Sequence, residues 1–171
     1  MKKRFETLLV VLSLGMAIPS LAQIKMFKSV AKPTKGIMVT YPAKPLSISI
    51  NRNVNDVYSF MSNPENMPLW AAGLSKAKME KSGDEWIAQS PMGKVKVRFA
   101  EKNKFGVVDH DVTLPSGEVN HNPLRAVRNG DGTEVTFTLY RLPRMTDIDF
   151  ENDSKAVQKD LEQLKRVLEN K

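Results

Sequence analysis

Few side chains in this sequence could do polar chemistry inside a folded domain, and His110 is the foremost of them. It lies within residues 107–114, where apolar and polar residues alternate. His110 shares its place in the alternation with Val108 and Val112, so it faces inward if they do. An inward imidazole could orient a ligand headgroup or act as an acid or base. The alternative is a core histidine satisfied by Tyr58 or a backbone carbonyl. No second catalytic group is apparent, so we expect no catalytic residues.

The sequence offers little for metal or cofactor chemistry. It contains no cysteine, which excludes disulfides and thiolate ligands. His121 is the only other histidine, and Asp109 and Asp111 point away from His110 in a regular strand. The chain has no phosphate loop, no dinucleotide fingerprint and no Ser-His-Asp signature. We therefore expect no metal and no cofactor.

The longest predicted element is a helix over residues 146–171, a segment without glycine or proline. Thr146 can cap its start, with Asp149 three residues later in a capping-box arrangement. Apolar positions recur at steps of four and three residues, which gives one stripe interrupted only by a small serine. A helix with one apolar face must lie on another layer. The stripe consists of Phe150, Ser154, Val157, Leu161, Leu164 and Leu168.

Upstream of that helix the apolar pattern changes to a period of two, which is typical of strands. Residues 46–50 form the first predicted strand, and two short helices follow, the first capped by Asn53 and the second around Trp70. Short turns such as residues 129–132 then join six strands into an antiparallel meander. These strands cover residues 76–80, 85–89, 94–99, 107–114, 118–128 and 133–140. The predicted fold class is α+β, an antiparallel sheet of about seven strands with a long C-terminal helix.

The first 22 residues have the three parts of a secretory signal peptide. Basic residues precede an apolar run that ends near Pro19, and the small residues Ser20 and Ala22 favour cleavage after Ala22. The run is too short for a membrane anchor. We therefore expect a bacterial protein exported to the periplasm or secreted. Residues 23–45, rich in lysine and proline, are predicted to form an irregular arm or linker, with an edge strand over residues 37–41 as the alternative.

Several segments of the chain resemble the SRPBCC superfamily, which includes START-like lipid-transfer domains and polyketide cyclase/dehydrase-like proteins. These segments are residues 50–70, 105–114 and 123–141, together with the closing helix. The resemblance covers residues 46–171 and implies a helix-grip fold, in which a curved antiparallel sheet wraps around the C-terminal helix. Where members of the superfamily bind ligands, the cavity lies between the sheet and that helix. The shared motifs indicate the fold well and the chemistry poorly.

The leading hypothesis for function is an exported, monomeric binding protein for a hydrophobic or amphipathic small molecule such as a lipid. The molecule would be held between the sheet and the C-terminal helix. The alternatives are an enzyme of the polyketide cyclase/dehydratase type and an interaction module whose cavity is filled, since the same inward residues could pack into a solid core. The candidate ligand-binding residues are Tyr58, Met61, Trp70, Trp86, Val97, Phe99, His110, Val112, Phe137 and Leu161.

The basic residues of the chain bear on its partners, because the formal net charge is +7. Lys94, Lys96 and Arg98 share the outward face of one predicted strand. They could make weak contact with an anionic membrane surface, although a solvated sheet face is the commoner explanation. An exported protein does not meet nucleic acid in the cytoplasm, so we expect no nucleic-acid partner.

Overall fold

The computed structural model describes residues 39–91 and 93–170 of the chain. The predicted signal peptide and most of the predicted arm lie outside the described residues. Within the described segments, no helix is long and apolar enough to cross a membrane. The elements are, in order, β1 (Ala43–Ile50), α1 (Val54–Met61), the 3₁₀ helices η2 (Pro64–Leu69) and η3 (Ala72–Leu74), β2 (Glu80–Ser82), β3 (Glu85–Ser90), β4 (Gly93–Phe99), β5 (His110–Thr113), β6 (Val119–Asn122), β7 (Leu124–Asn129), β8 (Gly132–Tyr140) and α2 (Asp147–Glu169).

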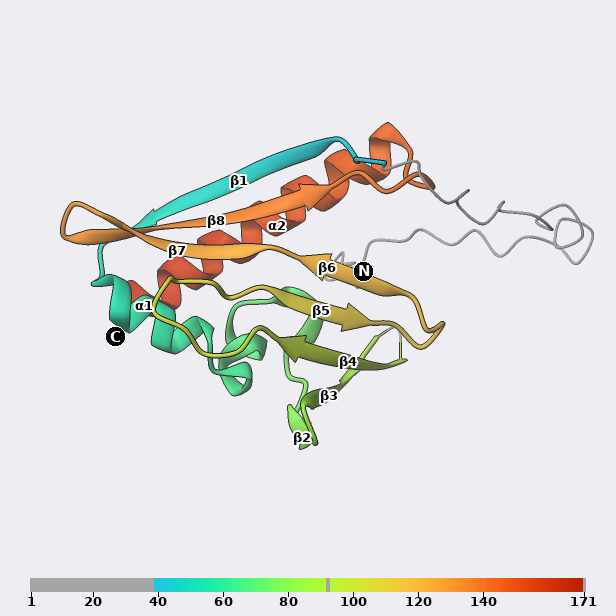
Figure 1. Cartoon of the computed structure of the whole chain (residues 1–171), viewed down its shortest axis with the longest axis horizontal. Coiled ribbons are helices and arrows are strands. Elements are labelled where there is room, and N and C mark those ends of the chain that lie inside the picture. The colour runs from blue at the N-terminus through green and yellow to red at the C-terminus, as the bar shows by residue number, and fades with distance from the viewer. Residues whose placement is uncertain (1–38, 92, 171) are drawn as a thin grey trace, which may run out of the picture.

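The fold is α+β, as the sequence predicts, with antiparallel strands in two sheets and a long C-terminal helix. One sheet has the order β1-β8-β7 and the other the order β2-β3-β4-β5-β6. Backbone hydrogen bonds cross the seam between them, from Val108 N to Leu124 O at 2.9 Å and from Ala126 N to Gly106 O at 2.9 Å. Figure 1 shows the strands of the two sheets following one another across the molecule. The two sheets therefore act as one layer toward the helix.

One predicted strand, residues 118–128, is two strands in the structure. Pro123 separates β6 from β7 because it has no amide hydrogen for the ladder. Its carbonyl still accepts a hydrogen bond from Thr138 N at 3.0 Å, so the chain continues alongside β8. The break accounts for eight strands where the sequence predicts seven.

Three other predicted strands differ from the structure by more than one residue at an end. Residues 107–114 shorten to β5, because the Asp109 side chain accepts from Leu124 N at 2.8 Å and takes the place of a ladder bond. Residues 76–80 shorten to a strand that begins only at Glu80, since Lys76 lies at φ +67° in a turn that leaves η3. The first strand begins at Ala43, which pairs with Tyr140, and residues 39–42 adopt no regular structure.

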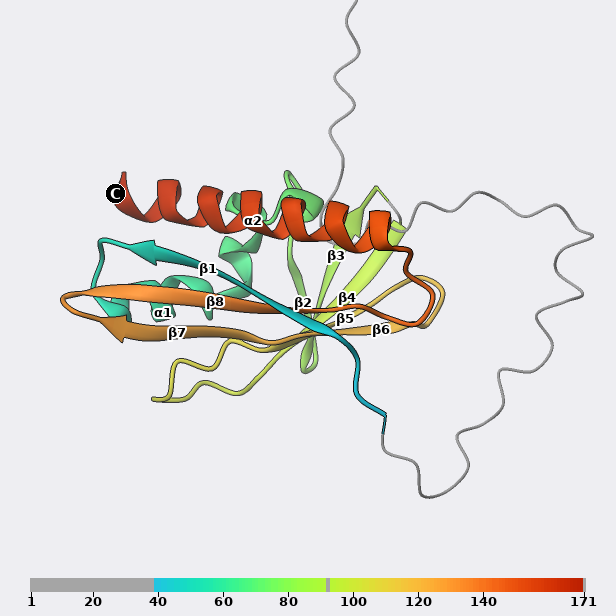
Figure 2. The ribbon, with the colours of Figure 1, turned by 90° about the horizontal axis from the view of Figure 1, so that it is seen from above.

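Helix α2 lies along one face of the sheets, as Figure 2 shows. The capping box predicted at its start is present: Thr146 Oγ1 accepts from Asp149 N at 3.1 Å, and Asp149 Oδ2 accepts from Thr146 N at 3.0 Å. The predicted stripe is buried apart from the half-buried Phe150. Two further positions of α2, Ala156 and Asp160, are buried as well.

Candidate ligand-binding cavity

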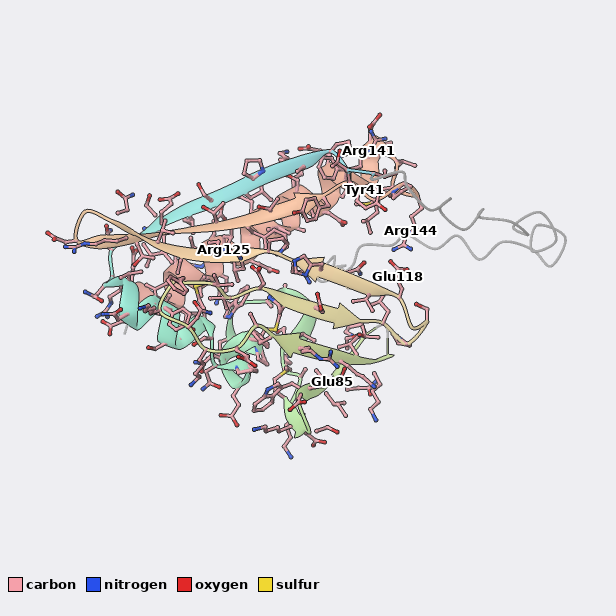
Figure 3. The ribbon with its side chains drawn as sticks, in the orientation of Figure 1. Tyr41, Glu85, Glu118, Arg125, Arg141 and Arg144 are labelled. Atoms are coloured by element: carbon pink, nitrogen blue, oxygen red, sulfur yellow. The ribbon has the colours of Figure 1, made fainter. Side chains whose placement is uncertain are left out.

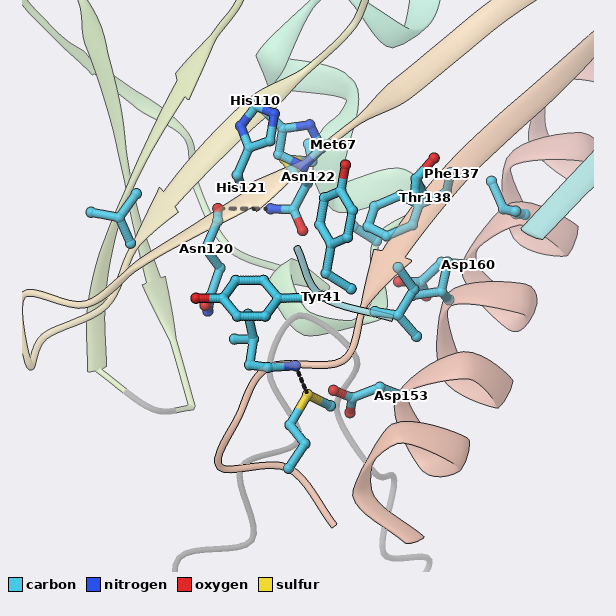
Figure 4. Close-up of a pocket in the computed structure, with 18 of the residues that line it drawn as sticks. Tyr41, Met67, His110, Asn120, His121, Asn122, Phe137, Thr138, Asp153 and Asp160 are labelled. Carbon is cyan, nitrogen blue, oxygen red and sulfur yellow. Dashed lines mark hydrogen bonds between the residues drawn. The ribbon is translucent and has the colours of Figure 1, made fainter. Parts of the chain in front are cut away.

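A cavity of about 270 Å³ lies between the sheets and the N-terminal part of α2 (Figure 4). Its walls come from β6, the end of β8, the segment that leads into α2, and η2 with the residues that follow it. The lining residues are Tyr41, Met67, Trp70, Ala71, His110, Val119, Asn120, His121, Asn122, Phe137, Thr138, Leu139, Tyr140, Leu142, Met145, Asp153, Val157, Asp160 and Leu161.

Four of the ten residues predicted from the sequence line this cavity, namely Trp70, His110, Phe137 and Leu161. The other six lie outside its lining. Among these six, the Tyr58 hydroxyl accepts from Asn103 N at 2.7 Å. Met61, Val97 and Val112 are buried core residues, and Trp86 and Phe99 are partly buried against that core.

His110 is only 5% exposed and faces inward, in agreement with its place in the alternation. Its Nδ1 lies 3.2 Å from the carbonyl oxygen of Val108, and its ring stacks on Phe99 with centroids 5.2 Å apart. Because a carbonyl oxygen only accepts, Nδ1 carries the proton and Nε2 is left as an acceptor. Burial lowers the pKa of His110 to about 4. The ring is therefore neutral at physiological pH.

Asp160 is one of two aspartates on the helix side of the cavity, and the sequence analysis did not select it. It is 6% exposed, and its Oδ1 accepts from Ala72 N at 3.0 Å. Burial raises the pKa of Asp160 to about 7. Its position in the sequence indicates burial, because Asp160 lies three residues after Val157 and four before Leu164, beside the apolar stripe. The apolar pattern did not include Asp160 because aspartate is ordinarily charged and exposed.

Two asparagines of β6 are also part of the wall and were not predicted. Asn122 pairs with His110 in the β5–β6 ladder, and Asn120 pairs with Val112, so both share the inward parity. Asn122 Nδ2 donates to the Asn120 carbonyl at 3.2 Å. Asn120 Oδ1 and the indole Nε1 of Trp70 are buried without a hydrogen-bond partner among the described residues. Trp70 itself is only 7% exposed.

The second histidine does not join His110 in a metal site. His121 Nδ1 pairs with Asp111 Oδ1 at 2.7 Å, and both side chains are substantially exposed. Since side chains alternate along a strand, this pair lies on the sheet face opposite His110. No group of three or more His, Cys, Asp or Glu residues suited to a metal occurs in residues 39–91 and 93–170.

The outer surface of the sheet and the rim of the cavity carry ion pairs. Lys94, Lys96 and Arg98 are exposed, and Glu85 binds Lys96 at 3.3 Å and Arg98 at 3.1 Å. At the rim, Arg144 pairs with Glu118, and Figure 3 shows these two side chains facing one another. Glu85 thus neutralises part of the basic strand face.

Comparisons with known proteins support the fold and no more. No protein-family model and no curated protein matches the sequence. The structure resembles DynU16, a protein of the dynemicin biosynthetic locus, with a TM-score of 0.59 and 11% identity over 74% of this chain and 47% of DynU16. It resembles an uncharacterized protein from Bacillus thuringiensis with a TM-score of 0.60 and 13% identity, over 74% of this chain and 98% of that protein.

A third similar structure is the Aha1 dimer from Colwellia psychrerythraea, with a TM-score of 0.58 and 15% identity over 75% of this chain and 96% of the Aha1 chain. The chain thus spans about half the length of DynU16 and nearly all of the other two proteins. At sequence identities this low, the similarity supports a shared arrangement of helices and strands, but it does not indicate an activity or a ligand.

Proposed function

We propose that this protein is an SRPBCC-like helix-grip domain that binds one small hydrophobic or amphipathic molecule beneath α2. The observation that carries the proposal is the cavity, whose mostly apolar wall contains a few inward polar groups. Such a combination is typical of ligand sites, which usually measure ~300–1,000 Å³. The volume of about 270 Å³ favours a ligand at the small end of that range.

The proposal includes export, which rests on the sequence of residues 1–22 alone. We expect the mature chain to begin at Gln23. Expression of the full chain in a bacterium with a periplasm, followed by intact mass measurement of the periplasmic fraction, tests this step. An uncleaved chain in the cytoplasm would contradict it.

Native mass spectrometry of the exported protein tests the binding itself. We expect a bound small molecule that is lost on denaturation. Leu161→Trp places a large ring in the cavity and should abolish that adduct, whereas the exposed Val127, on β7 outside the lining, provides the matched Val127→Trp control. A protein that carries no molecule and takes up no added amphiphile would be the interaction module instead.

The role of His110 is tested by His110→Phe, which keeps a ring against Phe99 and removes the Nε2 acceptor. Loss of one specific hydrogen bond costs roughly 1–3 kcal/mol, so we expect affinity to fall about tenfold to a hundredfold with the fold intact. NMR titration of the imidazole should give a pKa of about 4. A pKa near the ordinary value, unchanged by ligand, would place the ring outside the cavity.

One observation favours the enzyme alternative, namely that His110 and Asp160 line the same cavity and burial brings the pKa of Asp160 to about 7. A carboxyl group with that pKa can act as a general acid or base near neutral pH. If the protein is an enzyme of the cyclase/dehydratase type, the recovered molecule will differ from the one supplied, by the mass of one water after dehydration or by chromatographic retention at equal mass after cyclisation, and Asp160→Asn will abolish the difference. Recovery of unaltered molecules would favour the binding protein.

A further inference from the structure

The described lining of the cavity contains two aspartates but neither lysine nor arginine. The two aspartates are Asp153 and Asp160. Figure 4 shows both aspartates on the helix side of the cavity. Among the described lining residues, an anionic ligand would therefore meet two carboxyl groups and no lysine or arginine side chain.

Two arginines that adjoin lining residues in the sequence are already engaged with acids. Arg144 pairs with Glu118, and Arg141 NH2 lies 2.8 Å from Asp147 Oδ1. Figure 3 places both arginines at the end of the molecule where Tyr41 and Glu118 lie. To bind an entering carboxylate, either arginine would have to exchange one acid for another. The rim therefore does not compensate for the acidic wall.

The polar groups that remain available in the wall are neutral donors and acceptors. The Trp70 indole N–H has no acceptor among the described residues and lies in a side chain more than nine-tenths buried. His110 Nε2 is an acceptor, because Nδ1 donates to Val108. Asn120 Oδ1 is a second acceptor that no described residue satisfies. Unsatisfied buried groups of this kind are costly unless a ligand or water meets them.

We propose that the cavity selects uncharged amphiphiles whose polar group both donates and accepts a hydrogen bond, such as an alcohol, and rejects anionic ones such as free fatty acids. This inference rests on the proposed binding function. A hydroxyl can donate to His110 Nε2 or Asn120 Oδ1 and accept from the Trp70 indole. A carboxylate can only accept, and its burial without a cation is strongly unfavourable.

Calorimetric titration of the mature protein at pH 7.5 with octanol, octanoate and octylamine tests the selection, since the three share one apolar chain. We expect octanol to bind at least tenfold more tightly than octanoate, and octylamine, whose ammonium group can meet the wall carboxyls, to bind more tightly than octanoate as well. The Leu161→Trp protein, whose cavity is filled, measures binding elsewhere on the surface. Octanoate binding as tightly as octanol or octylamine would overturn the inference while leaving the proposed binding function intact. Failure of all three would overturn both.

Two further measurements connect the selection to named residues. Asp160→Asn keeps the acceptor for Ala72 N and removes the negative charge, so it should reduce the preference for octanol over octanoate. The chain has two tryptophans, and octanol should shift the indole N–H resonance of Trp70 but not that of Trp86. An unaltered preference in Asp160→Asn, or an unaltered Trp70 resonance, would contradict the assignment of these groups.

Discussion

The space between α2 and the sheets is filled at one end and hollow at the other. At the filled end, Leu164 and Leu168 of α2 pack in the core with Leu124 of β7 and Val135 of β8. At the hollow end, Leu161 borders the cavity together with Phe137 of β8. The same helix and the same strand run through both ends, so the apolar pattern of these two elements does not cause the difference.

The difference comes from what closes each end. Helix α1 contacts β7 and β8 at the filled end and contributes the buried residues Val57, Phe60 and Met61. Among the described residues, the other end has no equivalent helix, and η2 and the segment between β8 and α2 contribute to the cavity wall there. In that segment Leu142 N lies 3.3 Å from Met145 Sδ. The comparison teaches that the end of the molecule covered by α1 is filled, whereas the end without such a helix among the described residues holds the cavity.

We expect the largest loss of folding stability from Gly106→Ala, a substitution near the filled end. Gly106 has φ +71°, and a methyl group there would overlap the carbonyl oxygen of Ala126 across the seam of the sheets. We expect a loss of more than about 4 kcal/mol in unfolding free energy, measured by urea denaturation. Gly117, in the turn before β6, has φ +85° but no atom near a methyl group, so Gly117→Ala should cost only about 1–2 kcal/mol. Equal losses would mean that the seam is not closely packed.

The next largest effect separates two leucines of α2. Leu164→Ala empties a solid region, and Leu161→Ala enlarges space that already exists. Such substitutions usually lower the unfolding free energy by about 2–5 kcal/mol. We expect the loss for Leu164→Ala to lie near the top of that range. The loss for Leu161→Ala should lie near the bottom, since Leu161 borders the cavity and has fewer contacts to lose. Equal costs would argue that the cavity is filled. A cost below about 0.5 kcal/mol at Leu161 would mean that the helix does not pack on the sheets there.

The third prediction concerns the pH dependence of stability. The folded pKa of Asp160, about 7, lies above the ordinary value of 3.8, so the native state retains a proton that the unfolded chain releases. Stability should therefore fall as pH rises from about 4 to 7. Asp160→Asn should remove this loss and be more stable than the wild type at pH 8, by roughly 1–3 kcal/mol. The advantage should vanish near pH 4, as measured by denaturation at each pH.

His110 provides the opposite control for that experiment. Its pKa in the folded protein, about 4, lies below the ordinary value of 6.5, so between these pH values the unfolded chain binds a proton that the native state does not bind. The stability that the protein gains from keeping His110 neutral is therefore lost as pH falls from about 6.5 to 4. His110→Phe should abolish this loss of stability. If both variants followed the wild-type pH profile, neither group would be buried as described.

The smallest effect is expected at the start of α2, next to the hollow end. Thr146→Ala removes the capping box and should cost about 1 kcal/mol. Hydrogen bonds from the Thr146 side chain and backbone lower the pKa of Asp149, so NMR titration should show that pKa rising in the variant. Amide exchange should accelerate in the first turn of α2 and stay unchanged around Leu164. A change that reached Leu164 would mean that the two ends of the helix are not independent.

The sequence alone determined those features that depend on local spacing. The period of the apolar stripe and the capping residues of α2 were readable because they repeat within one or two turns. The inward position of His110 and the outward positions of Lys94, Lys96 and Arg98 followed from alternation along single strands. The bounds of β2, β5 and β6 were not readable, because a turn conformation, the Asp109 side chain and Pro123 override the local pattern there.

Only the tertiary structure decided which inward residues surround empty space. Val97 and Val112 have the same parity as His110, yet they are buried members of the hydrophobic core and do not line the cavity. Asn120 and Asn122 became part of the wall through the register of β6 with β5, across a turn whose geometry the sequence does not specify. Asp160 has a buried carboxyl because α2 lies against the residues that follow η2. Alternation assigns a side chain to a face, whereas a cavity depends on how separate elements fill the volume over that face.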